Sequence, residues 1–337
     1  LDLESDAQTF QVTPIGGADS IPQAYDRYFG RIVTGADLNG DGVDDLIIGQ
    51  HRRQGLDLED DTGAVFVFYG PIDHDRVCDP THAEYATYGP DLIFTGADAD
   101  DNLGTAVSDA GDVNGDGYVD LIIGSGGAGQ ARVVRGGSHL PADGSHTVSD
   151  VTYWWLLMFG FMGDDMGGML ATKARDVNLD GYGDVLMGAP TYETENGATA
   201  VVFAPEPMES SGPITIMEDT QGWSHMQVPN TVCSSCSRFY GLAGAAGRFD
   251  GDLTVDLVGA AQDDGNNGSI YMAFDLDTTP SLPTELVLEN DADVILRAES
   301  TGGELGRYVT VLGDYDGDGL EDVVFSDREY GVNNPGR

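Results

Sequence analysis

Short apolar runs recur along the chain, each bounded by polar, glycine-rich turns, and this pattern predicts β-strands. The clearest runs follow an aspartate and end in glycine, as in "DLIIG" at residues 45–49 and again at 120–124. β-Branched residues between turn residues favour strands, and no segment has the sustained 3.6-residue periodicity of a long helix. The sequence therefore predicts an all-β protein.

These runs belong to five related segments, each with an Asp- and Gly-rich loop before the apolar run. A glycine motif such as "NLGTAV" comes before the loop, and two further strands follow, such as "GAVFVFYG" and "DLIFTG". Four short strands per unit, repeated at even spacing, predict a β-meander blade. The expected fourth strands lie at residues 91–96, 151–160, 213–219 and 293–299.

One such sheet cannot bury both of its faces, so neighbouring blades must stack. The architecture that fits is a single β-propeller domain over residues 1–337, built from four-stranded antiparallel blades. Residues 9–15 are expected to supply an outer strand of the last blade, and the fifth unit stops before its third strand. The units span approximately residues 16–90, 91–158, 159–222, 223–296 and 297–337.

The order of glycine motif, acidic loop and strands resembles the FG-GAP repeat of the integrin α-subunit propeller. "LMGAP" at residues 186–190 matches the closing residues of that repeat. The resemblance implies calcium loops on one face, ligand recognition on the opposite face, and usually seven blades. Five repeats are visible here, so either a five-bladed ring closes imperfectly or the chain is part of a longer, seven-bladed propeller.

The loops themselves predict calcium binding. In an extended hairpin, side chains at positions 1, 3, 5 and 9 converge, and position 7 offers its carbonyl oxygen; calcium requires six to eight such oxygens. A plain turn needs only one or two of these residues, and an EF-hand needs a glutamate where Ile123 stands. Four loops are expected to hold about four ions, with these ligands: Asp37, Asn39, Asp41, Val43 and Asp45; Asp112, Asn114, Asp116, Tyr118 and Asp120; Asp176, Asn178, Asp180, Tyr182 and Asp184; Asp314, Asp316, Asp318, Leu320 and Asp322.

The fourth loop departs from this pattern. Arg248 replaces the first aspartate and Leu253 replaces the turn glycine, which leaves Asp250, Asp252 and Asp256. We expect this loop to hold no calcium, with the Arg248 guanidinium partly neutralising the three carboxylates.

The charge balance excludes some partners. With 58 Asp and Glu against 15 Lys and Arg, the net charge is −43, which repels phosphate backbones and anionic membranes. We expect no nucleic-acid partner, and the longest apolar stretch, residues 153–162, is too short to span a bilayer. Four calcium ions would change the charge only to −35, so they do not explain the acidity of the remaining surface.

The three cysteines are too few for a disulfide framework. Cys233 and Cys236 are close enough in sequence for a disulfide in an oxidising compartment; free thiols or a metal site are the alternatives. His74, Asp75, Cys78 and His82 are able to bind metals, but a solvated loop is the expected role of residues 72–85.

A ligand is expected on the face opposite the calcium loops. There, Arg52 or Arg53 could bind a carboxylate of the ligand, or it could form an ion pair within the chain with Glu59, Asp60 or Asp61. The aromatic residues Tyr25, Tyr28, Phe161 and Tyr192 could stack on a ligand or pack at the rim. The face is expected to comprise residues 16–28, 50–63, 97–102, 125–130, 160–166, 190–197, 261–268 and 300–304.

Three function classes remain open at this point. The favoured one is a calcium-stabilised extracellular or cell-surface adhesion propeller that binds protein or polysaccharide, with or without a partner subunit. The alternatives are a polysaccharide lyase or a hydrolase-associated propeller, and a purely structural surface scaffold. No catalytic constellation is visible, and fold alone does not choose among them.

Overall fold

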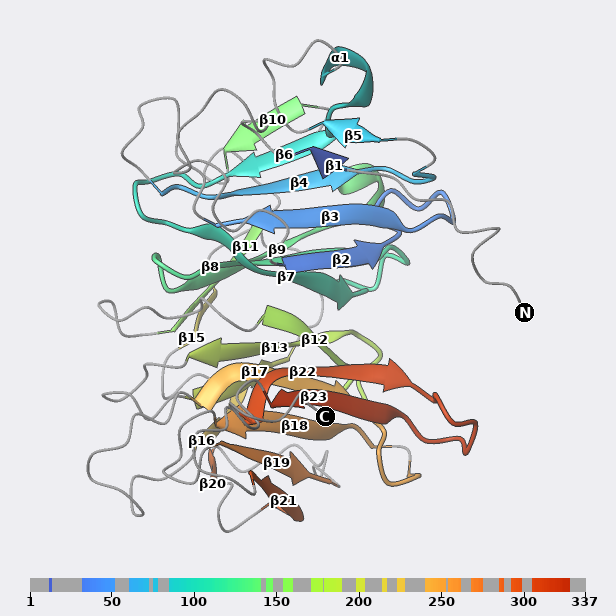
Figure 1. The fold of residues 1–337 in the computed structure, drawn as a ribbon, viewed down its shortest axis with the longest axis vertical. Coiled ribbons are helices and arrows are strands. Elements are labelled where there is room, and N and C mark those ends of the chain that lie inside the picture. Colours follow the sequence, from blue (N-terminus) through green and yellow to red (C-terminus); the bar gives the residue numbers. More distant parts are fainter. Residues whose placement is uncertain are drawn as a thin grey trace, which may run out of the picture.

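The computed structural model is all-β, with each of the five predicted loops joining two antiparallel strands (Figure 1). It describes residues 12–13, 32–51, 61–72, 75–77, 85–140, 144–147, 154–159, 171–177, 179–189, 198–203, 214–216, 223–227, 240–252, 254–261, 268–274, 285–287, 292–298 and 305–327. The loop-forming hairpins are β2 (Ile32–Ala36) and β3 (Asp45–Gln50), β7 (Leu103–Gly111) and β8 (Asp120–Ser125), β12 (Ala171–Arg175) and β13 (Asp184–Ala189), β17 (Tyr240–Gly247) and β18 (Asp256–Ala261), and β22 (Leu305–Gly313) and β23 (Asp322–Asp327).

The first four units continue as meanders, as the sequence predicts. The third strands are β4 (Ala64–Phe68), β9 (Gln130–Val134), β14 (Ala198–Val202) and β19 (Ser269–Ala273). The fourth strands are β6 (Leu92–Thr95), β11 (Trp154–Phe159), β16 (Trp223–Gln227) and β21 (Val294–Arg297). Each of these strands pairs antiparallel with the one before it in its sheet.

The prediction of four strands per blade was wrong for the first three sheets. Each of them has a fifth, outermost strand that comes from the next unit and pairs in parallel with the fourth strand. These are β10 (Gly144–Thr147), β15 (Ile214–Ile216) and β20 (Glu285–Val287). We call them exchange strands, because each leaves its own unit, between the third and fourth strands, to complete the preceding sheet.

One predicted strand therefore changes its role. The run at 213–219 was expected to be the fourth strand of the third unit, but β15 within it is an exchange strand on β11. The fourth strand of the third sheet is β16. The remaining elements are β1 (Val12–Thr13), which pairs in parallel with β5 (Arg76–Val77), a short helix α1 (Tyr85–Tyr88) and a 3-10 turn η1 (Gly137–His139).

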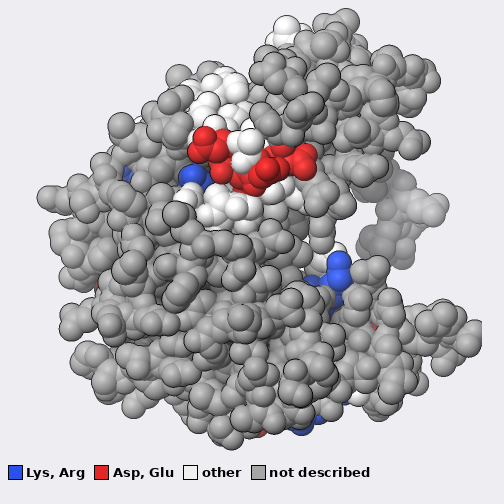
Figure 2. Space-filling model, turned by 90° about the vertical axis from the view of Figure 1, so that its left-hand side faces the viewer, with Lys and Arg blue, Asp and Glu red and all other residues white. Residues whose placement is uncertain are grey.

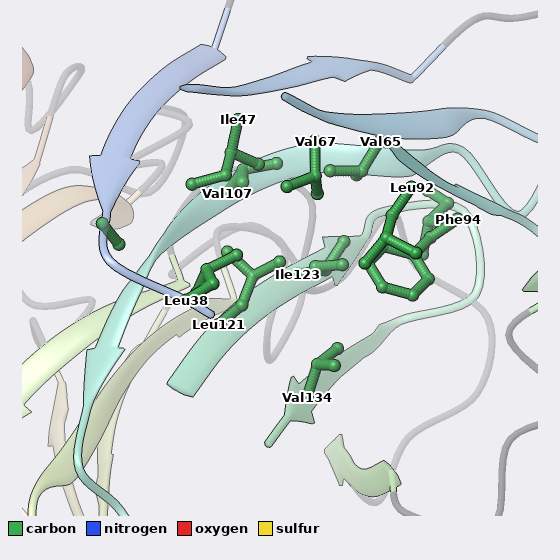
Figure 3. Close-up of a cluster of buried hydrophobic side chains, with 12 residues drawn as sticks. Leu38, Ile47, Val65, Val67, Leu92, Phe94, Val107, Leu121, Ile123 and Val134 are labelled. Atoms are coloured by element: carbon green, nitrogen blue, oxygen red, sulfur yellow. The ribbon is translucent and has the colours of Figure 1, made fainter. Parts of the chain in front are cut away.

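The sheets stack face to face, and their apolar faces form the core. Between the first and second sheets, Ile47, Val65 and Phe94 lie in one cluster with Leu121 and Ile123 (Figure 3). A second cluster joins the third and fourth sheets through residues such as Leu186 and Tyr271. A third packs the β22–β23 hairpin onto the fourth sheet. Apart from the short β1–β5 pair, the described strands thus form four stacked sheets and a terminal hairpin, and they show no closed ring.

Two glycine motifs meet where consecutive sheets touch. Gly49 closes the "DLIIG" run of β3, and Gly104 belongs to the glycine motif at the start of β7. A Cβ at Gly49 would lie 2.6 Å from the Gly104 carbonyl oxygen, and a Cβ at Gly104 would lie 2.7 Å from the Ala64 carbonyl oxygen. The backbones of the two sheets therefore approach too closely for side chains, which explains why both motifs contain glycine.

Candidate metal centres

The five acidic loops lie at one end of the stacked sheets, on the right in Figure 1. Each begins where the first strand of a unit ends, and its ninth residue is the first residue of the second strand. Of the predicted ligands, only Asn178 lies outside the described residues, and the others are described; Leu253 of the fourth loop also lies outside them. Repetition of one hairpin in each unit thus brings the predicted sites to the same face.

The carboxylate at the first loop position organises the backbone around itself. Asp37 Oδ1 accepts hydrogen bonds from the N–H groups of Gly40 (2.8 Å) and Asp41 (3.0 Å), and its Oδ2 accepts one from Gly42 (2.9 Å). The equivalent aspartates repeat this with two N–H donors each: Asp112 with Asp116 and Gly117, Asp176 with Asp180 and Gly181, and Asp314 with Gly317 and Gly319. The wrapped loop holds the polar side chains on a fixed backbone.

Glycine at the sixth loop position has a direct structural reason. Its φ angle is +88° at Gly42, +89° at Gly117, +97° at Gly181 and +93° at Gly319, a region that residues with a Cβ rarely adopt. The fourth loop has Leu253 at this position, so its sequence lacks the residue that the wrapped conformation favours.

The ninth-position aspartate has a role that sequence reasoning missed. Asp45 Oδ2 accepts a hydrogen bond from the N–H of Leu38 (3.0 Å), while Oδ1 accepts one from Gly70 (2.9 Å), just past the third strand. Asp120 makes the same two contacts, with Val113 (3.0 Å) and Gly136 (2.9 Å). The contact with the second loop residue recurs at Asp184, Asp256 and Asp322. The contact with the second loop residue, which we call the clasp, ties the loop to the start of the second strand in all five units, including the one without the first aspartate.

Burial of the clasp changes the titration of its carboxylates. Desolvation raises the pKa of Asp120 to about 7, although the N–H groups of Gly136 and Val113 oppose the rise; repulsion from Asp116 and Asp112 adds to it. Desolvation likewise raises the pKa of Asp45. Because the folded-state pKa of Asp120 exceeds 3.8, its contribution to stability falls as the pH rises from about 4 to about 7. A nearby cation would favour the ionised form and offset this loss.

The donor chemistry fits a hard divalent cation. The loops offer carboxylate and amide oxygens, which suit calcium or magnesium and not the softer metals. In the fifth loop, ligand atoms of Asp314, Asp316 and Asp322 all lie within 4.8 Å of one another. The assignment of individual ligands, including the carbonyl oxygens of position 7, stays a prediction.

The fourth loop also gathers three carboxylates. Ligand atoms of Asp250, Asp252 and Asp256 lie within 4.8 Å of one another. The Arg248 side chain is exposed, and the contacts of this residue with Glu321 of the fifth loop are made by its backbone N–H and carbonyl groups. The expectation that this loop holds no calcium stays a prediction.

Neighbouring loops touch one another. The ring of Tyr118, at position 7 of the second loop, lies where a Cβ of Gly40 would be, and Tyr182 of the third loop covers Gly115 of the second in the same way. The Gly183 N–H donates to the Asp112 carbonyl (2.9 Å). A longer-range contact joins Arg175, just before the third loop, to Glu321 of the fifth loop by an ion pair. Order in one loop therefore supports order in the next.

Comparison with known proteins agrees with this geometry. The FG-GAP repeat model matches residues 29–68, which include the first loop and the strands β2, β3 and β4. The chain carries an FG-GAP repeat.

Integrin α subunits are among the proteins similar to this chain. Human integrin α-IIb is 29% identical over 171 residues, which cover 48% of this chain and 15% of that protein. Integrin α-PS3 of Drosophila melanogaster is 26% identical over 51% of this chain and 14% of its own length. Integrin α-8 of Gallus gallus is 25% identical over 56% of this chain and 17% of its own length. The resemblance to the FG-GAP and integrin α family is confirmed, while the matched stretch spans about one sixth of these relatives.

The turns at the other end of the stacked sheets are described in part. Figure 2 shows this face, where acidic side chains gather among the described residues; Asp98 and Asp100, in the turn between β6 and β7, are exposed there. Several predicted functional residues lie outside the described ranges: Tyr25, Tyr28, Arg52, Arg53, His74, Cys78, His82, Phe161, Tyr192, Cys233 and Cys236. None of the helices in the described part of the chain is long and apolar enough to cross a membrane.

The fourth unit, whose loop is expected to bind no calcium, allows the clasp to be tested separately from metal binding. Asp256 is fully buried and accepts the Phe249 N–H at 2.6 Å. Asp256→Ala is expected to lower the free energy of unfolding by about 2–3 kcal/mol, because it leaves a donor without its acceptor. Urea denaturation at two calcium concentrations should give the same loss at both. Asp250→Ala, at an exposed position of the same loop, is the control and should change stability far less. A loss that grows with calcium concentration would instead make Asp256 a ligand.

Proposed function

We propose that this chain is a calcium-stabilised adhesion module that binds an extracellular protein ligand. The observation that carries the proposal is the gathering of the acidic loops at one end of the FG-GAP sheets (Figure 1). Calcium at that end would stiffen the first turn of each unit. The turns at the opposite end would remain available for recognition, as loops on rigid scaffolds commonly are.

The similarity to integrin α subunits supports a role in adhesion and a location at the cell surface or outside the cell. No enzyme is among the relatives named above, which gives the lyase and hydrolase alternatives no support. The similarity to integrin α subunits also favours a protein ligand over a glycan. The requirement for a partner subunit follows the same analogy and belongs to the proposal.

The test is binding of the purified chain to an array of matrix proteins and glycans, in millimolar calcium and again in chelator. Calcium-dependent binding to a protein is the expected result. Binding to glycans alone would replace the proposed ligand class. If the folded protein binds nothing on the array, this would contradict the proposal that the chain binds a ligand by itself, and it would favour a scaffold role.

Two charge reversals at opposite ends of the sheets locate the binding face once a ligand is found. Asp98→Lys changes an exposed residue on the turn face, and Asp44→Lys changes an exposed residue of the first calcium loop that is not a predicted ligand. Both add the same charge to the protein, so long-range electrostatics is matched. Asp98→Lys should change the Kd more than Asp44→Lys; the reverse order would place the ligand on the calcium face.

A further inference from the structure

The exchange strands reveal a regular connection between consecutive units. β10 pairs with β6, β15 with β11, and β20 with β16, each in parallel and each from the segment between a third and a fourth strand. β5 lies in the same segment of the first unit, between β4 and β6, and pairs in parallel with β1. In the first three of these pairs, a segment between a third and a fourth strand pairs in parallel with the fourth strand of the preceding sheet. If β5 follows the same rule, its partner β1 takes the place of a fourth strand that precedes the first sheet.

The same rule leaves two edges open at the other end of the stack. Among the described residues, β21 has no parallel exchange strand and β23 has no third strand beside it. In units two to four a single segment supplies both a third strand and the exchange strand of the preceding sheet. The two open edges are therefore the two places that one such segment would fill.

Exposure at matched positions agrees with this reading. In the fourth strands, Leu296 of β21 is 36% exposed, whereas its counterpart Phe94 of β6, beside an exchange strand, is fully buried. In the second strands, Val324 of β23 is 44% exposed and its counterpart Ile122 of β8 is fully buried. The fourth sheet and the terminal hairpin thus carry apolar side chains that are more exposed than their counterparts in the earlier sheets.

The two ends of the stack differ in this respect. Phe66 and Phe68 point away from the second sheet and are fully buried. On the outward face of the terminal hairpin, Tyr308 is 55% and Leu312 is 53% exposed. Terminal units of stacked repeats normally carry a polar outer face, so the β22–β23 end has the character of a contact surface.

We propose that the open edges of β21 and β23 form one docking surface for an extended polypeptide segment of the repeat's own type. The segment adds a third strand antiparallel to β23 and then a short exchange strand parallel to β21. Main-chain hydrogen bonds along both edges supply affinity, as in other cases of strand addition. The occupant is mostly uncharged along its first strand, like β4 ("AVFVF") and β19 ("SIYMA"). Residues 328–337, "REYGVNNPGR", contain no such run.

A peptide with the sequence of residues 128–147 is a matched probe, because it contains β9 and β10. The second unit aligns with the fifth without gaps from "LG" (103–104 and 305–306) to the end of the second strand. Its two arginines and one aspartate give a net positive charge, which favours approach to a chain of charge −43. The control peptide carries Val133→Pro, which keeps the charge but removes a backbone donor from the strand and fixes its φ.

Docking of the peptide is measured by amide hydrogen exchange of the full 337-residue chain in the presence of calcium. With the peptide at about ten times its Kd, exchange of exposed-edge amides in both β21 and β23 is expected to slow by about tenfold, and the control peptide should leave both unchanged. Protection of one edge without the other would overturn the two-edge surface. Protection that rises with protein concentration without peptide, together with dimer formation, would make a second copy of the chain the occupant and overturn the proposal. Equal effects of the two peptides, or none, would also overturn it.

Discussion

Removal of calcium is expected to destabilise the protein more than any single substitution outside its core. An ion that binds only the folded state stabilises it by about 2.7 kcal/mol at a concentration one hundred times its Kd. Four independent sites would add about 11 kcal/mol, which is comparable to the whole stability of a typical domain. Without the ions, carboxylates such as those of Asp314, Asp316 and Asp322 remain crowded within 4.8 Å. Thermal and urea denaturation in calcium and in chelator measure the effect.

A pair of substitutions separates specific sites from general charge screening. Asp316→Asn in the fifth loop is expected to remove about a quarter of the calcium-dependent stability, whereas Asp252→Asn in the fourth loop should leave it unchanged. Both residues are exposed and belong to a three-carboxylate group. Equal effects of the two substitutions, or calorimetric titration of five ions, would contradict the prediction for the fourth loop. An unchanged melting temperature in chelator would contradict calcium stabilisation altogether.

Local sequence predicted the hairpins well, because each is specified within a few residues. The ninth-position aspartate, the following apolar run and the glycine-rich loop place β3, β8, β13, β18 and β23 without reference to other units. The closing glycine of the run and the glycine motif of the next unit were also evident in the sequence. Only the structure shows that Gly49 and Gly104 lie against each other.

The exchange strands could not be predicted in the same way, since another unit determines them. β10 has the sequence "GSHT", with no apolar signal, and it is a strand because its backbone pairs with Leu92–Thr95. The run at 213–219 resembles a fourth strand more closely than "WSHMQ" at Trp223–Gln227 does, yet the latter pairs with β14. Local propensity is a weak guide where a distant edge decides the pairing.

The candidate sites show the same limit. Spacing alone brings the loop carboxylates together, so they could be proposed as ligands. The contact of Asp45 with Gly70 joins residues 25 positions apart and depends on where the third strand ends. A clue was present: the ninth aspartate persists in the fourth loop, where the first is lost. Its retention there is explained by a structural role that needs no ion.

The close approach of the sheets at Gly104 predicts the second large effect. Gly104 has φ +88°, and an added Cβ would lie 2.7 Å from the Ala64 carbonyl oxygen and 3.3 Å from the Gln50 nitrogen. Both atoms are backbone of the first sheet, so no side chain can move aside to make room. Gly104→Ala is expected to lower the free energy of unfolding by about 4 kcal/mol, combining about 1–3 kcal/mol of backbone strain with a similar cost of overpacking. Urea denaturation in saturating calcium measures it.

Gly111→Ala measures the cost of backbone strain alone, because Gly111 has φ +74° on the same strand and a Cβ there would meet nothing within 4 Å. This variant should lose about 1–2 kcal/mol. The excess loss in Gly104→Ala then measures how rigidly the first two sheets are held against each other. Equal losses in the two variants would mean that the sheets separate at little cost, and the glycine motif would then be required for φ alone. A large excess would mean that the backbone contact between units, and not only the apolar core, limits which residues this repeat can carry.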